Sequence, residues 1–152
     1  IRPEDAAIER DFVSGLSGQS KFLRFMYTLE ALTPAMLSRF TQIDYDREMA
    51  LIAVLSEPDG AERQVGVARY STLPDGLACE FAIVVGDAWQ GRGLARQLLG
   101  RLIEAARGRR LAVMRGVTLA ENRRMVELAR SLGFAIERDP DDRELVAMCL
   151  DL

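Results

Sequence analysis

Apolar residues recur along the chain with two periods, one typical of helices and one typical of strands. Helical spacing, preceded by a turn and a capping acid at Pro3 to Asp5, predicts five helices. They cover residues 6–16, 20–29, 33–43, 92–107 and 122–132, and Gly133 ends the last one. Short apolar or alternating runs predict six strands. These cover residues 50–55, 64–71, 77–85, 113–119, 134–137 and 144–150.

Turn residues between these segments indicate how the strands connect. Pro58-Asp59-Gly60 separates the first two strands and Pro74-Asp75-Gly76 the next two, which predicts an antiparallel meander. Two strand–helix–strand passages follow. The order predicts an α+β fold, a mixed and mostly antiparallel sheet flanked by helices. No linker or repeat divides residues 1–152, so we expect one domain, and the start at Ile1 instead of a methionine suggests a domain taken from a longer chain.

Composition excludes several kinds of chemistry. The chain has no histidine, which excludes Ser-His-Asp and Cys-His catalysis and any His-ligated metal. Its two cysteines cannot form a four-thiolate zinc site, so we expect no metal. Free thiols are typical of a reducing cytoplasm, and no apolar run approaches the length of a membrane span. We therefore expect a cytoplasmic protein with no membrane partner.

Charge is concentrated in one segment of a chain whose net charge is only −3. Residues 92–130 contain ten arginines and three glutamates, whereas residues 1–91 and 131–152 are both net acidic. Such a segment favours a polyanion, either a phosphorylated cofactor or a nucleic acid. No aromatic residue lies among these arginines, although nucleic-acid modules interleave the two types. We therefore expect a phosphorylated cofactor and no nucleic-acid partner.

The junction between the strand at 77–85 and the next helix carries the most informative motif. It reads Gln90-Gly91-Arg92-Gly93-Leu94-Ala95, and Arg96 follows. Glycines let a backbone approach a ligand closely, and the first N–H groups of a helix have no partner inside the helix. This arrangement binds a pyrophosphate. The spacing matches neither a Walker loop, which needs a lysine here, nor a dinucleotide fingerprint, which needs a third glycine.

Gln90-x-x-Gly93-x-Ala95 resembles motif A of the GNAT superfamily of acyl-CoA-dependent N-acetyltransferases. Asn122, with Leu132-Gly133-Phe134 at the end of its helix, resembles the second cofactor-side motif, and residues 2–5 resemble the opening strand and helix cap. The resemblance implies a GNAT fold in which splayed strands form the site for acetyl-CoA, without a metal. It implies pyrophosphate contacts from Gln90, Gly91, Arg92, Gly93, Leu94, Ala95 and Arg96, pantetheine contacts from Ile83, Val84 and Val85, and a cofactor contact from Asn122.

More narrowly, residues 22–54 resemble the catalytic domain of bacterial Pat-type protein lysine acetyltransferases. This resemblance implies transfer of an acetyl group to a lysine of a protein, for example an acyl-CoA synthetase, and a fused regulatory domain in the full-length chain. Two alternatives remain open: a GNAT enzyme that acetylates a small amine, and a CoA-binding sensor without catalysis. Retention of the motif and of Glu80 argues against the sensor.

Glu80 is the candidate general base. It is the only acidic residue in the strand at 77–85, and the resemblance places the catalytic glutamate of the family at this position. The strand is predicted to be buried, so we expect the carboxylate to be partly desolvated; a surface or salt-bridged glutamate is the alternative. Many GNAT enzymes protonate the leaving thiolate with a tyrosine, but Ala129 occupies that position here. Neighbouring Cys79 lacks a basic group to activate it, so we expect it to pack in the core.

An acidic cluster precedes the first strand and consists of Asp44, Asp46 and Glu48. It is either a solvated loop or a surface that recognises a basic, lysine-bearing region of a substrate protein.

Overall fold

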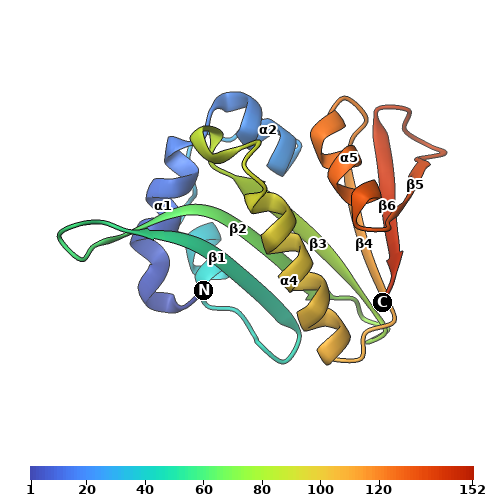
Figure 1. Ribbon diagram of the computed structural model, residues 1–152, viewed down its shortest axis with the longest axis horizontal. Coiled ribbons are helices and arrows are strands. Elements are labelled where there is room, and N and C mark those ends of the chain that lie inside the picture. The colour runs from blue at the N-terminus through green and yellow to red at the C-terminus, as the bar shows by residue number, and fades with distance from the viewer.

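A computed structural model describes residues 1–152, and Figure 1 shows its arrangement of helices around one sheet. The helices are α1 (Ala6–Gly15), α2 (Gly18–Phe25), α3 (Pro34–Thr41), α4 (Leu94–Gly108) and α5 (Arg123–Ser131). The strands are β1 (Glu48–Ser56), β2 (Glu62–Thr72), β3 (Ala78–Val85), β4 (Val113–Leu119), β5 (Ala135–Arg138) and β6 (Leu145–Asp151). None of the helices combines the length and apolar character needed to cross a membrane.

The six strands form one sheet in the order β1-β2-β3-β4-β6-β5. All neighbours are antiparallel except β3 and β4, which confirms the α+β prediction and the β1–β2–β3 meander. The second strand–helix–strand passage differs from the simplest interpretation of the sequence. After α5 the chain enters β5 at the outer edge, and β6 then returns to pair with β4. Helices α4 and α5 lie on one face of the sheet, and α1 to α3 lie on the other.

Local side-chain contacts define where the N-terminal helices begin and end. The hydroxyl of Ser17 accepts a hydrogen bond from the Ser20 amide at the start of α2, and Thr33 caps α3 in the same way. Helix α2 ends at Phe25, earlier than the predicted residue 29, because Met26 adopts a left-handed conformation with φ 62°.

The expected opening strand is wrong. Residues Pro3–Asp5 form a short 3-10 turn, and the sheet contains no segment before β1. The Asp5 carboxylate accepts a hydrogen bond from the Arg2 amide at 2.7 Å and does not cap α1. The N-terminal amine instead donates to the Ala50 carbonyl at 2.8 Å. A single terminal hydrogen bond, and not a strand ladder, therefore joins the start of the chain to β1.

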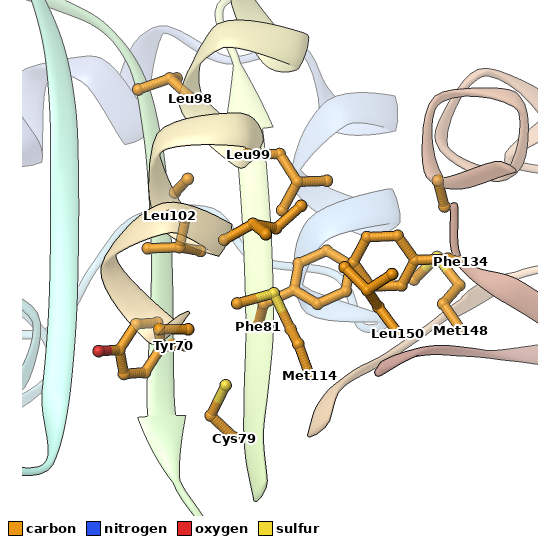
Figure 2. Close-up of a cluster of buried hydrophobic side chains, with 14 of the residues drawn as sticks. Tyr70, Cys79, Phe81, Leu98, Leu99, Leu102, Met114, Phe134, Met148 and Leu150 are labelled. Atoms are coloured by element: carbon orange, nitrogen blue, oxygen red, sulfur yellow. The ribbon is translucent and has the colours of Figure 1, made fainter. Parts of the chain in front are cut away.

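The main core lies between the sheet and α4, with α5 closing one side (Figure 2). Leu99 and Leu102 of α4 are fully buried against it, which stabilises the fold by roughly 1.5–3 kcal/mol for each such side chain. Phe81 of β3 and Phe134, just after α5, pack with ring centroids 5.2 Å apart. A Cβ atom on Gly116 would lie 2.5 Å from the Phe81 ring. Only glycine therefore lets this ring lie against β4.

A smaller core covers the opposite face of the sheet. Phe12 and Val13 of α1, with Leu16 just after it, pack there against Val67, and Val84 lies beside them. Successive residues of a strand alternate between the two faces of the sheet. Val84 and Glu80 are therefore on the face that carries the N-terminal helices, and Phe81 is on the face that carries α4. This alternation determines which side of the sheet each candidate site residue can serve.

Candidate active site

Strands β3 and β4 pair over only three residues and then separate. Ala78 to Glu80 pair with Val113 to Arg115, but β3 continues to Val85 without further pairing on this side. Apart from the Val85 carbonyl, which accepts a hydrogen bond from the Gln90 side chain, the backbone groups along this edge are therefore free to bond an extended ligand, much as a neighbouring strand would. The separation opens a cleft of about 870 Å³ between α2, the end of β3, the start of α4 and α5. Ile83, Val84 and Val85 line it, as the resemblance implied for the pantetheine arm.

The predicted pyrophosphate loop forms one end of this cleft. Gly91 and Gly93 adopt left-handed conformations, with φ values of 74° and 81°, which favour glycine. Helix α4 begins at Leu94, two residues later than predicted, because Gly93 is its N-cap in this conformation. The first intrahelical bond is donated by the Gln97 amide to the Gly93 carbonyl at 3.2 Å. The amides of Leu94, Ala95 and Arg96 therefore remain free, at the positive end of the helix dipole.

This loop fits the diphosphate of acetyl-CoA. A Cβ atom at Gly91 or Gly93 would meet no protein atom within 4 Å, so the glycines serve backbone conformation and ligand approach, not internal packing. Gln90, Gly91, Gly93, Ala95 and Arg96 line the cleft. Arg92 and Leu94 do not, since the Arg92 guanidinium lies 5.0 Å from the centroid of the Trp89 ring and Leu94 packs against the core. Trp89 packs against the core and also lines the cleft.

A hydrogen-bond network that the sequence analysis missed joins the walls of the cleft. Asp87 accepts hydrogen bonds from the Ser17 amide, the Ser17 hydroxyl and the Ser20 hydroxyl, at 2.9, 2.7 and 2.7 Å. The Gln90 amide group donates to the Val85 carbonyl and the Ser20 hydroxyl, and its oxygen accepts from Arg124 of α5. The network therefore connects α2, the pyrophosphate loop and α5.

Electrostatics favour an ionised Asp87. Burial alone would raise the pKa of this carboxyl, but the hydrogen bonds from Ser17 and Ser20 outweigh it and hold the pKa below its ordinary value. The sequence offered only a weak signal for the contact, because Ser17 is an ordinary helix-capping residue 70 positions away from Asp87.

Two further cofactor candidates contact α5. Asn122 accepts a hydrogen bond from the Met125 amide and donates one to the Thr118 hydroxyl, so it caps α5 while lining the cleft. Arg96 donates to the Ser131 hydroxyl at 2.8 Å and so bridges α4 and α5. The Arg96 contact holds α5 close to the start of α4, and the cofactor contacts of both side chains stay predictions.

Glu80 lies at the point where β3 and β4 separate. It is the last β3 residue paired with β4, opposite Arg115, and it pairs with Ser71 on the other side. Its side chain is exposed, contrary to the expected partial burial, because no helix covers this part of the sheet. We call this surface the open face; it comprises the exposed side chains of Ser71, Glu80, Arg115 and Val117. Glu80 itself does not line the cleft, whose β3 wall begins three residues later.

The remaining candidates take up structural positions. Cys79 is fully buried, and burial raises the pKa of its thiol to about 11, which keeps it protonated and confirms the packing prediction. Ala129 is fully buried in the core. No tyrosine lines the cleft, and Tyr70 lies buried beneath α4 with its hydroxyl unpartnered.

The acidic cluster before β1 does not line the cleft. Glu48 forms an ion pair with Arg39 of α3 and accepts hydrogen bonds from the Ser71 hydroxyl and the Asp44 amide. The Arg39 guanidinium holds the pKa of this carboxyl below its ordinary value. Asp44 accepts a hydrogen bond from the Asp46 amide at 3.0 Å, and both residues are exposed. Only Asp44 and Asp46 are therefore free to meet a partner, at a distance from the cleft.

Comparison with known proteins agrees with this geometry. A sequence model of the acetyltransferase (GNAT) family matches residues 21–134. An acetyltransferase of Pseudomonas aeruginosa is 39% identical over 142 residues, covering 93% of this chain and 76% of that protein.

Solved structures share the fold. The GNAT domain of S. lividans PAT superposes with a TM-score of 0.90 at 26% identity, over 100% of this chain and 88% of that one. An acetyltransferase-like protein of Salmonella typhimurium, yncA, was solved with its cofactor acetyl-CoA. It matches with a TM-score of 0.73 at 22% identity, over 100% and 91% of the two chains.

Proposed function

The chain belongs to the acetyltransferase (GNAT) family, whose members use acetyl-CoA, and from this premise we propose that it acetylates the side-chain amine of a lysine on another protein, with Glu80 as general base. The observation that carries the proposal is the position of Glu80, on an open face of the sheet at the point where β3 and β4 separate, three residues before the β3 wall of the cofactor cleft. An amine that approaches from this face reaches the carboxylate directly from solvent.

A base is needed because the acceptor amine is almost entirely protonated. A lysine with a pKa near 10.4 is neutral only about 0.04% of the time at pH 7. A positioned general base contributes roughly 10²- to 10⁴-fold to such a reaction. The chain has no histidine, so a carboxylate is the natural candidate, and Glu80 is the only acidic residue of β3.

The cleft residues bind and orient the other substrate. Acetyl-CoA supplies the activated thioester. The free amides after Gly93 and the Arg96 side chain favour its diphosphate, and the unpaired edge of β3 from Ile83 to Val85 can bond the amide groups of its arm. Glu80 accepts the proton of the acceptor amine. No tyrosine of this chain is placed to protonate the departing thiolate, so we expect solvent to do so.

Two further observations support a protein acceptor over a small amine. The side chains of the open face are exposed and not enclosed in a pocket, and Phe22, Met26 and Tyr27, on α2 and just after it, are exposed apolar side chains. Small ligands usually bind in concave sites that bury most of their surface. The similarity to the GNAT domain of PAT, with a TM-score of 0.90, supports the same assignment.

The only lysine of the chain is not a suitable acceptor for its own active site. Lys21 is 9% exposed, and its Nζ donates a hydrogen bond to the Glu30 carbonyl at 2.8 Å. We therefore expect the lysine to come from another protein, for example an acyl-CoA synthetase.

The test is acetylation of a bacterial protein extract by the purified protein, compared with free lysine and polyamines at equal amine concentration and read by mass spectrometry. We expect selective modification of a few protein lysines by the wild type and little by Glu80→Gln. Glu104→Gln is the matched control, an exposed glutamate on α4 far from the open face. Faster acetylation of a small amine than of any protein lysine would replace the proposal with the small-amine alternative.

A further inference from the structure

Arg24 presents a cation to the cleft that no residue of the chain neutralises. It lies on α2, is half-buried and lines the cleft together with Val84 and Val85. Its guanidinium lies 4.8 Å from the centroid of the Phe25 ring. It takes part in none of the five ion pairs of the molecule. Of the other arginines that line the cleft, Arg96 and Arg124 have hydrogen-bond partners, and Arg123, whose side chain has none, is exposed to solvent.

The surroundings of Arg24 contain an excess of positive charge. The nearby anion, Glu9, is already bound to Arg69, with Oε1 and Nη2 3.1 Å apart, and it also accepts a hydrogen bond from Gln64. Burial, with Arg69 close by, lowers the pKa of Arg24 to about 10, so the guanidinium stays charged at neutral pH. A partly desolvated cation without an anion is costly. This place therefore suits an anionic group brought by a ligand.

Arg24 lies on the same face of the sheet as Glu80, so we expect the anionic group to belong to the acceptor. Arg69, its charged neighbour, pairs with Ala82 of β3, so both point toward the N-terminal helices. Glu80, two residues before Ala82, points the same way. The diphosphate of the cofactor has its own binding groups at the start of α4, namely the free amides and Arg96.

We propose that Arg24 is a specificity-determining residue that binds a carboxylate of the acceptor, so that the preferred lysine has an aspartate or glutamate near it in its own protein. This proposal rests on the protein-lysine function above. The acceptor would present its amine to Glu80 and its carboxylate to Arg24, on the same face of the sheet. A guanidinium suits this role because it can bond both oxygens of a carboxylate in one plane.

The experiment uses lysine peptides that carry one glutamate at each position within three residues of the lysine, each paired with a peptide that has glutamine there. The measured quantity is the ratio of kcat/KM for the glutamate peptide to that for the glutamine peptide. For the wild type we expect a ratio of about ten at one position or more, typical of a charge-assisted hydrogen bond. Arg24→Gln should reduce the ratio to near one, Arg24→Lys should restore part of it, and Arg24→Glu should favour peptides with arginine at that position.

Arg101→Gln, an exposed arginine of α4, is the control and should keep the wild-type ratio. The Kd for acetyl-CoA of each variant is measured in parallel. A wild-type ratio of one at every position, or a ratio that survives in Arg24→Gln, would overturn the inference. So would a raised Kd for acetyl-CoA with an unchanged ratio, since the cation would then serve the cofactor. Failure of every lysine peptide, with a small amine accepted, would instead contradict the proposed function itself.

Discussion

The two halves of the active site are built by different means. On the cofactor side, we expect most contacts with acetyl-CoA to come from backbone groups, namely two left-handed glycines, the free amides of α4 and the unpaired edge of β3. On the proposed acceptor side, the groups are side chains from separate elements, with Glu80 on β3 and Arg24 on α2. A backbone site needs a fixed local sequence and is visible as a motif. A site made of side chains depends on the fold and changes freely with the substrate.

The largest expected effect comes from a substitution that impairs only the cofactor half of the site. Gly93→Val should weaken binding of acetyl-CoA by at least about 100-fold, because a β-branched residue strongly disfavours the left-handed conformation that directs the amides of α4 at the ligand. Titration calorimetry measures the affinity, and circular dichroism checks the fold.

Gly60→Val is the matched control for that substitution. Gly60 has φ 83°, close to the 81° of Gly93, but it does not line the cleft. It lies in the turn between β1 and β2, which Figure 1 shows at the opposite end of the molecule from α5. Gly60→Val should introduce the same backbone strain and leave the affinity for acetyl-CoA unchanged. Unchanged binding by Gly93→Val would place the diphosphate elsewhere.

A smaller effect is expected where the two halves meet. Asp87→Asn weakens the hydrogen bonds that hold α2 to the pyrophosphate loop, and we expect about a tenfold loss in acetyl-CoA affinity with about 1 kcal/mol of stability. Asp11→Asn, at an exposed site whose only ion pair is with Arg10, is the control. If Asp87→Asn equals Asp11→Asn in affinity and in Tm, the network does not position the loop.

The pKa of Asp87 gives this prediction a pH dependence. Its folded pKa lies below the ordinary value, so ionised Asp87 stabilises the folded protein above about pH 4. That contribution is lost as the pH falls through the folded pKa. The difference in Tm between wild type and Asp87→Asn should therefore be constant near neutral pH and shrink in acid. A difference that grows in acid would contradict the assigned sign.

The smallest effect is expected for the acidic loop before β1, where only Asp44 and Asp46 remain free. Asp44→Asn with Asp46→Asn should slow acetylation of a basic protein by only about two- to threefold at low salt, because exposed charges act mainly on encounter. The difference should vanish at high salt and be absent for a short lysine peptide. Equal kcat/KM for mutant and wild type on the protein at low salt would leave the loop with no part in recognition.

Much of the fold could be predicted from the sequence because local patterns carried it. The Pro-Asp-Gly turns determined the meander, and the apolar periodicity of α4 determined its buried face. The position of β6 between β4 and β5 could not be predicted, since strand order depends on pairing between distant segments. The opening strand was expected by resemblance alone, and a single hydrogen bond to Ala50 takes its place.

The same division applies to the site. The position of the loop before α4 followed from Gly91 and Gly93, and the structure adds that both glycines adopt left-handed conformations. The apolar run around Glu80 suggested burial, but no helix covers that end of β3. The sequence of a strand does not reveal which helices will pack over it. Glu48 looked like part of a free acidic cluster, yet Arg39, nine residues earlier, binds it. The Asp87 network and the unpaired Arg24 depend on contacts that only the folded chain brings together.

The central claim, that Glu80 removes the proton of a lysine amine, is tested most directly by the pH dependence of kcat/KM for a lysine peptide at saturating acetyl-CoA. Glu80→Gln should lower the rate at pH 7 by about 100-fold or more while acetyl-CoA affinity is kept. The mutant rate should then rise about tenfold per pH unit toward the pKa of the amine, because the amine deprotonates unaided. A mutant with the wild-type rate at pH 7, or one whose deficit does not shrink as the pH rises, would contradict the assignment.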